Sequence, residues 1–143
     1  MKKSIIFGLA VFFSIIFNAQ GQTVIGKWKT IDDETGQAKS IVEIYEKSGK
    51  IYGKIIEIVN PEKRKSLCTK CSGENKNAPI LGLTIIKGLV KDWDEYNGGK
   101  ILDPNKGEEY KCLIVLEEKD KLKVRGFVGV SLFGRTQYWS REK

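Results

Sequence analysis

The sequence predicts an all-β fold, an antiparallel up-and-down barrel of about eight strands. Eight short runs alternate apolar and polar side chains with the two-residue period of a strand. Short turn-forming segments separate most of these runs, as in hairpins. After the N-terminal segment, no stretch of 10 or more residues has the 3.6-residue period of an amphipathic helix. Closing such a meander into a barrel removes its two exposed edges, whereas a two-sheet sandwich is the alternative that the pattern leaves open.

The first 21 residues have the order of a secretory signal peptide. Lys2 and Lys3 precede an apolar run over residues 4–17, and the small residues Ala19 and Gly21 follow it. This run of 14 residues is shorter than the roughly 20 that a membrane-spanning helix needs. We therefore expect a signal peptide over residues 1–21, no membrane span, and one exported domain over residues 22–143, either periplasmic or secreted.

The predicted strands follow in order along the exported domain. They cover residues 24–30, 39–46, 50–59, 82–86, 100–103, 108–118, 121–128 and 133–141. Turn signals lie at residues 32–36, 47–49, 104–107 and 119–120, where Gly, Asp, Asn, Ser and Pro gather. Residues 89–96 could hold a short helical turn.

One long irregular segment, residues 60–81, interrupts the series of strands. It is rich in Lys, Asn and Ser, and loops of this length in compact domains are usually functional or mobile. A basic group in it could meet an anionic component of the cell envelope. This group, the basic loop, consists of Lys63, Arg64, Lys65 and Lys70. The other lysines are spread over almost every segment, so we expect no nucleic-acid partner despite the formal net charge of +7.

Two of the three cysteines form a C-x-x-C pair, Cys68 and Cys71. A redox motif would need a helix within a βαβ unit, which the sequence does not predict. With Cys112 and no histidine, a zinc site would have only three soft ligands. We therefore expect a structural disulfide and no metal site, with Cys68–Cys71 and a link from either residue to Cys112 both open.

No recognisable reaction centre stands out. Histidine is absent, which removes the commonest general base and the usual nucleophile pairs. Carboxylates at Asp92, Asp94, Glu95 and Asp103 could in principle form an acid–base pair, Asp92 with Asp103. The simpler interpretation is that the first three are exposed around Trp93 and that Asp103 holds a turn. We expect no enzyme activity and no cofactor.

The last predicted strand carries large side chains on alternate positions, since Phe133, Arg135, Gln137 and Trp139 share one face. If this face points inward, the barrel interior is amphipathic, with a cation placed to meet a carboxylate or phosphate head.

Gly26-Lys27-Trp28 on the first predicted strand resembles the G-x-W motif of lipocalins. That resemblance implies that Trp28 closes one end of the barrel and stacks against an arginine near the last strand. The available arginines are Arg125, Arg135 and Arg141, and Arg135 or a neighbour is the expected partner. Longer stretches at residues 93–112 and 122–139, with "CTKC" followed by "APILGLTII", resemble the bacterial family named domain of unknown function 2147. This resemblance covers about residues 24–139 and implies a small exported lipocalin-like domain, without catalytic or binding residues to transfer.

Two functions of different class follow from these observations. The first is a binding protein that holds a small amphipathic or apolar ligand in its lumen. The second is an envelope structural or interaction protein with a packed barrel, which uses the basic loop and binds no ligand. The candidate ligand-lining or barrel-closing residues are Trp28, Tyr52, Trp93, Arg125, Arg135 and Trp139.

Overall fold

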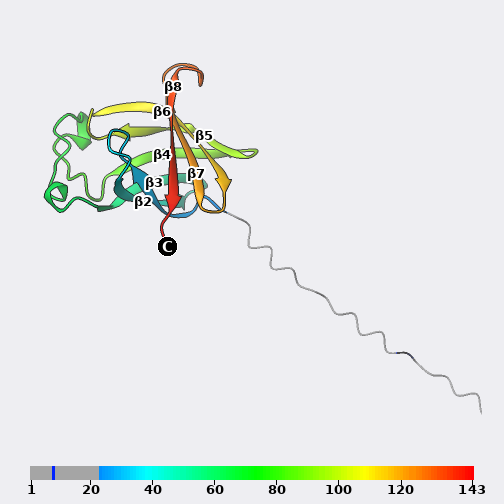
Figure 1. The fold of residues 1–143 in the computed structure, drawn as a ribbon. Helices are drawn as coiled ribbons and strands as arrows, with labels where there is room; N and C mark the ends of the chain where they lie inside the picture. Colours follow the sequence, from blue (N-terminus) through cyan, green and yellow to red (C-terminus); the bar gives the residue numbers. More distant parts are fainter. Residues whose placement is uncertain (1–7, 9–22) are drawn as a thin grey trace, which may run out of the picture.

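The computed structural model describes residue 8 and residues 23–143, and the latter form a closed barrel of eight antiparallel strands (Figure 1). The predicted signal peptide lies outside the described residues, apart from Gly8. In chain order the strands are β1 (Gly26–Ile31), β2 (Ala38–Lys47), β3 (Lys50–Ile58), β4 (Thr84–Asp92), β5 (Glu95–Asp103), β6 (Glu108–Glu118), β7 (Lys121–Phe127) and β8 (Gly134–Arg141). Each strand pairs with the next, and β8 pairs with β1, which confirms the barrel and excludes the sandwich.

The predicted helical turn over residues 89–96 is wrong, because β4 and β5 form one hairpin whose turn contains Trp93 and Asp94. The sequence also predicted strands at 82–86 and 100–103 that are much shorter than β4 and β5. Two glycines explain the difference: Gly88 has φ of 73° and Gly98 has φ of 80°. Residues with such φ values interrupt the regular pleat, so the two-residue alternation is lost there even though the strands continue.

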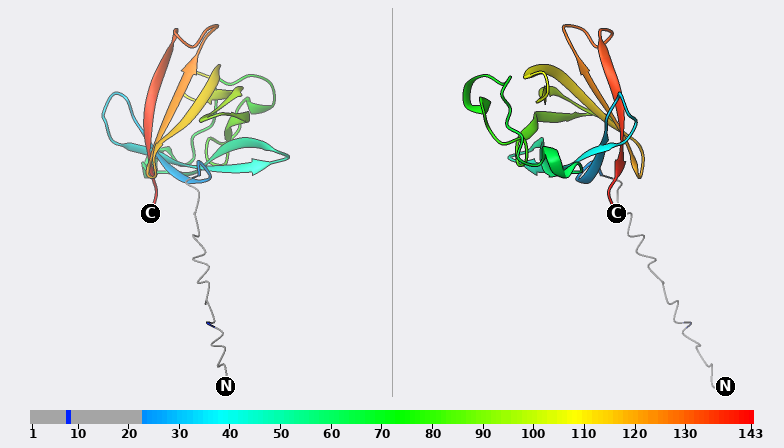
Figure 2. Two further views of the ribbon diagram at one scale, coloured as in Figure 1. Left: turned by 90° about the vertical axis from the view of Figure 1, so that its right-hand side faces the viewer. Right: turned by 60° about the vertical axis from the view of Figure 1, so that its left-hand side comes forward.

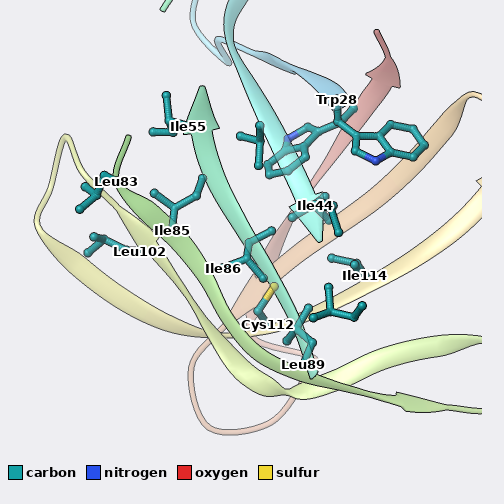
Figure 3. Close-up of a cluster of buried hydrophobic side chains, with 14 of the residues drawn as sticks. Trp28, Ile44, Ile55, Leu83, Ile85, Ile86, Leu89, Leu102, Cys112 and Ile114 are labelled. Atoms are coloured by element: carbon teal, nitrogen blue, oxygen red, sulfur yellow. The ribbon is translucent and has the colours of Figure 1, made fainter. Parts of the chain in front are cut away.

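Side chains fill the half of the barrel that lies around Trp28 (Figure 3). The largest fully buried ones are Trp28, Val42, Ile44, Ile86, Leu89, Cys112, Ile114 and Leu122. Packing is so close that a Cβ atom added at Gly53 would lie 3.2 Å from both Ile86 and Val42. This half of the barrel therefore holds a large part of the hydrophobic core, which also includes Cys68, Leu83 and Leu102 beneath the β3–β4 connection.

The long connection between β3 and β4 is tied to itself and to the β5–β6 hairpin. It contains two 3₁₀ turns, η1 (Pro61–Lys63) and η2 (Gly73–Asn75), and an isolated bridge joins Leu67 to Pro79. The Sγ atom of Cys68 lies 3.4 Å from the carbonyl oxygen of Pro104, in the β5–β6 turn. Among the described residues, no helix is long and apolar enough to cross a membrane.

Candidate functional site

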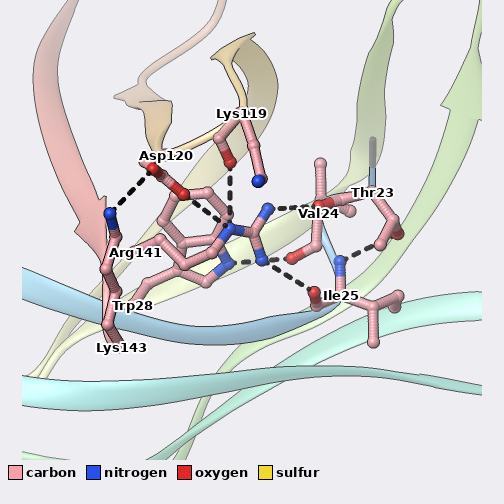
Figure 4. A network of polar contacts seen from close by, with 8 residues as sticks. All are labelled: Thr23, Val24, Ile25, Trp28, Lys119, Asp120, Arg141 and Lys143. Atoms are coloured by element: carbon pink, nitrogen blue, oxygen red, sulfur yellow. Dashed lines mark hydrogen bonds and ion pairs between the residues drawn. The ribbon is translucent and has the colours of Figure 1, made fainter. Parts of the chain in front are cut away.

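Trp28 and Arg141 close one end of the barrel (Figure 4). The two residues face each other across the β1–β8 pairing, and the guanidinium carbon of Arg141 lies 4.2 Å from the centroid of the Trp28 ring. The same guanidinium donates hydrogen bonds to the carbonyl oxygens of Thr23 (2.7 Å), Ile25 (3.2 Å) and Lys119 (2.9 Å). Trp28 is completely buried. Together the two side chains seal this end.

The partner of Trp28 is therefore Arg141, and the expectation of Arg135 is wrong. Arg135 lies six positions earlier on β8, which at about 3.3 Å per residue places it roughly 20 Å away along the strand. Arg125 is not the partner either, since its guanidinium donates to the carbonyl of Ser131 and to the hydroxyl of Thr136. All three arginines near the chain end were possible partners of Trp28 from the sequence. Only the register of the β1–β8 pairing shows which of them reaches the ring.

The face of β8 that carries Gln137 and Trp139 points into the barrel. Trp139 lies opposite Leu122 and Gln137 lies opposite Val124, and both β7 residues are buried. Side chains directly opposite each other in adjacent strands share a face of the sheet. Because side chains on one strand alternate between faces, Arg135 belongs to this inner face as well.

A chain of polar contacts runs along this face toward the end opposite Trp28, which we call the mouth. The indole N–H of Trp139 donates to Oε1 of Gln137 (3.1 Å), and the amide of Gln137 donates to a carboxylate oxygen of Asp33 (2.7 Å). The same Asp33 carboxylate forms an ion pair with Arg135. Asp33 lies in the β1–β2 connection. Its contacts with Arg135 and Gln137 therefore join β8 to this neighbouring loop at the mouth.

Beside this face, the inward positions of β5, β6 and β7 at the mouth are accessible to solvent. Ile101 and Tyr110 are cross-strand partners, and Ile101 is also paired with buried Ile86, so all three face inward. A Cβ atom at Gly126 would lie 3.4 Å from Ile101 and 3.5 Å from Tyr110, at ordinary contact distance. Ile101, Tyr110 and Gly126 are each partly exposed to solvent. These three inward positions are therefore accessible from the mouth, in contrast to the buried side chains around Trp28, and we call this part of the interior the open half.

Tyr110 also has a polar partner at the mouth. Its hydroxyl donates a hydrogen bond to the Glu108 carboxylate, which together with desolvation raises the pKa of Tyr110 to about 12. The phenol is therefore a neutral donor at physiological pH.

Tyr52 and Trp93, the remaining candidates, lie away from the mouth. Tyr52 stacks on Tyr45, with 5.9 Å between ring centroids, and lines an external groove of about 500 Å³ between β2, β3 and residues 74–87. Trp93 is 91% exposed at the tip of the β4–β5 hairpin. Of the predicted residues, the structure thus places Arg135 at the mouth and Trp28 at the sealed end, and Trp139 is buried between these two ends.

Asp92 and Asp103 do not form a paired-carboxylate site. Asp92 pairs with Glu95 at the first residue of β5, whereas Asp103 is its last residue, so the two aspartates lie at opposite ends of this strand. Asp103 accepts hydrogen bonds from the backbone N–H groups of Asn105 and Lys106, as expected for a turn-forming residue.

The cysteines confirm the expected structural disulfide. Cys68 and Cys71 are joined, with 5.3 Å between their Cα atoms, which excludes a link to Cys112. Cys112 is a free thiol inside the barrel, and burial raises its pKa to about 12.

Sequence reasoning missed Asp33, Ile101 and Tyr110 as mouth residues. The alternation of β6 could have placed Tyr110 inside. In contrast, nothing local in the β1–β2 turn indicates that Asp33 reaches toward β8.

Comparison with known proteins agrees with the fold. The family described as an uncharacterized protein conserved in bacteria (DUF2147) matches residues 26–141. Among solved structures, protein HP1028 from the human pathogen Helicobacter pylori, which belongs to the lipocalin family, aligns with a TM-score of 0.76 at 21% sequence identity. The alignment covers 86% of this chain and 85% of that chain. No curated protein matches the chain. The chain therefore belongs to the DUF2147 family, and its barrel has the lipocalin fold.

Proposed function

We propose that this protein is an exported binding protein that holds one small amphipathic molecule in the open half of its barrel. The observation that carries the proposal is the partial exposure of inward-facing Ile101, Tyr110 and Gly126, next to side chains that are buried around Trp28. An eight-stranded barrel has an interior that is either filled or large enough for one small ligand. The accessible inward positions at the mouth favour the second alternative for this barrel.

The chemistry of the mouth indicates how such a molecule would lie. Its apolar part would contact Ile101, Tyr110 and Gly126, whereas its polar head would remain near Arg135 and Asp33. Because Asp33 already neutralises Arg135, an anionic head must compete with this carboxylate for the guanidinium. A head group that both donates and accepts hydrogen bonds can use the pair without breaking it. We therefore infer a preference for polar neutral or singly charged heads.

Two observations support export. The first 21 residues follow the signal-peptide pattern. The Cys68–Cys71 disulfide is of a type that persists in oxidising compartments such as the periplasm or the extracellular space. The proposed role is binding, with no catalytic step assigned.

A fluorescence titration with a matched pair of variants tests the binding proposal. The probe is a dansyl-labelled medium-chain fatty acid, whose emission rises on transfer from water to an apolar site. Gly126→Val introduces a side chain inside the open half. Ser140→Val replaces the side chain at an exposed position on the outer side of β8. We expect the wild type and S140V to bind alike and G126V to bind about tenfold more weakly, which corresponds to about 1.4 kcal/mol. Equal affinity of all three proteins would contradict a site in the lumen.

A second candidate function rests on the basic loop, as an attachment to an anionic envelope polymer. Lys63, Lys65 and Lys70 are exposed, and the disulfide restrains the segment that carries them. Arg64 is less available because its Nε donates to the carbonyl of Ile58 (3.0 Å). Reversing the three lysine charges to Glu should abolish retention on a dextran sulfate column at low salt. The same reversal at control lysines should have a smaller effect, and equal loss would indicate net charge alone. The control lysines are Lys47, Lys50 and Lys91.

A further inference from the structure

The loop between β7 and β8 exposes four large apolar side chains at the mouth end of the barrel. We call them the apolar tip; they are Val128 (65% exposed), Val130 (56%), Leu132 (84%) and Phe133 (72%). The β7–β8 hairpin, coloured orange to red, extends beyond the other strands at the end away from the C-terminus (Figure 2). Connecting loops are usually polar, and a narrow convex projection of this kind offers a protein partner little area for a stable interface.

Most backbone carbonyls of this loop accept hydrogen bonds, either from the loop itself or from the strands below it. The carbonyl of Val130 accepts from the N–H of Phe133 (3.1 Å), and that of Phe133 accepts from the N–H of Val128 (3.0 Å). Two basic side chains from the strands below do the same. Arg125 donates to the carbonyl of Ser131 through Nε (2.8 Å) and Nη2 (2.7 Å), and Lys111 donates to that of Gly129 (3.2 Å). A carbonyl that already accepts a hydrogen bond has a smaller free-energy cost of transfer from water to an apolar medium. The backbone of this loop can therefore enter an apolar medium at lower cost.

The charge of the hairpin has one sign. Residues 121–141 contain five basic residues and neither aspartate nor glutamate. Of these, Arg125 lies directly beneath the tip, and Lys111 of β6 joins it there through its contact with Gly129. Exposed apolar side chains above a collar of lysine and arginine are the arrangement by which peripheral proteins dock on anionic lipid surfaces.

We propose that the apolar tip docks on an anionic lipid bilayer. Leu132 and Phe133, the most exposed members, enter the boundary between head groups and acyl chains, while Arg125 and Lys111 face the lipid phosphates. Because Gly126 and Arg135 belong to the same hairpin, docking also brings the mouth of the barrel toward the bilayer. This surface proposal stands independently of ligand binding in the lumen.

Vesicle flotation with matched variants tests the proposal, using the chain from residue 22 to residue 143. The vesicles are phosphatidylcholine alone or a mixture with phosphatidylglycerol. Leu132→Ser with Phe133→Ser removes the two most exposed side chains of the apolar tip, and Trp93→Ser removes a still more exposed ring from a different hairpin. We expect the wild type and W93S to float with the anionic vesicles. The double variant should lose about tenfold or more in partition coefficient, since two apolar side chains no longer enter the membrane.

Two further measurements define the contact. Raising the salt concentration should weaken binding of the wild type to anionic vesicles, because ions screen the basic collar. Phe133→Trp should keep binding, and brominated lipids should quench the fluorescence of the new indole. The proposal is wrong if the wild type binds neither vesicle, if the double variant binds as well as the wild type, or if W93S loses as much. It is also wrong if the double mutation abolishes a dimer in sedimentation without affecting vesicle binding, since the tip would then join two copies of the chain.

Discussion

The guanidinium of Arg141 covers the indole ring of Trp28, with 4.2 Å between the guanidinium carbon and the ring centroid. This contact joins the last residue of β8 to β1 at the point where the barrel closes. It closes the barrel between its first and last strands at one end, and the proposed ligand would enter at the opposite end. The same residue pair therefore closes the fold and determines at which end the proposed ligand would enter.

Replacing Arg141 by Met should lower the free energy of unfolding by about 2–4 kcal/mol, because it removes a cation–π contact and several charge-assisted hydrogen bonds. Urea denaturation followed by tryptophan fluorescence measures this change. The matched control is Arg135→Met at the mouth, where the side chain is 58% exposed and a surface ion pair contributes up to about 1 kcal/mol. Equal effects of the two substitutions would argue against a stabilising plug.

Gly107 and Gly49 form a second matched pair, since both lie in turns with positive φ, 66° and 77°. A Cβ atom at Gly107 would collide with the carbonyl oxygen of Lys70, whereas one at Gly49 would meet nothing within 4 Å. Gly49→Ala should cost about 1 kcal/mol of stability from backbone conformation alone. Gly107→Ala should cost about 1–3 kcal/mol more, as overpacking does. Similar unfolding midpoints for the two variants would show that the long loop does not rest on the β5–β6 turn.

The Cys68–Cys71 disulfide closes a short loop, so its removal should have a moderate effect. A double substitution to Ser should lower the free energy of unfolding by about 2 kcal/mol, the chain-entropy value for a loop of this size. A reducing agent should lower the thermal midpoint of the wild type to about that of the double variant. The midpoint of the double variant itself should not change. A reductant effect on the double variant would point to another redox-sensitive group.

Cys112 should resist alkylation in the folded protein, because burial raises the pKa of its thiol to about 12. Iodoacetamide at pH 8, followed by mass spectrometry, should modify it only after denaturation. In the unfolded chain the thiol ionises near its ordinary pKa of 9.0. The unfolded state therefore releases its proton first, and the contribution of this group to stability declines as the pH rises above 9. Rapid labelling of the folded protein would mean that the core opens readily.

The sequence pattern predicted the barrel because its evidence is local: alternation shows a strand, and a turn signal joins it to the next. It failed at Gly88 and Gly98, where positive φ interrupts the alternation while hydrogen bonding continues. The disulfide was one of several pairings that composition allowed, and only the distance between Cys68 and Cys71 selects it.

The site was less predictable than the fold, because it depends on contacts between distant segments. Alternation placed Arg135, Gln137 and Trp139 on one face, but whether that face points inward is a property of the closed barrel. The contact between Asp33 and Gln137 joins residues 104 positions apart, and neither turn nor strand chemistry indicates it. Likewise, the choice of Arg141 over Arg135 depends on the register between the first and last strands.

Native mass spectrometry tests the central claim, ligand binding in the open half, most directly. The protein would be expressed from the full sequence, with residues 1–21 included, purified without detergent, and compared with the G126V variant prepared in the same way. The account predicts an additional mass on the wild type that disappears on denaturation and is reduced or absent on G126V. A bare mass for both proteins, with a known lipocalin retaining its ligand in parallel, would contradict it. An additional mass of equal abundance on both would instead place the ligand outside the barrel.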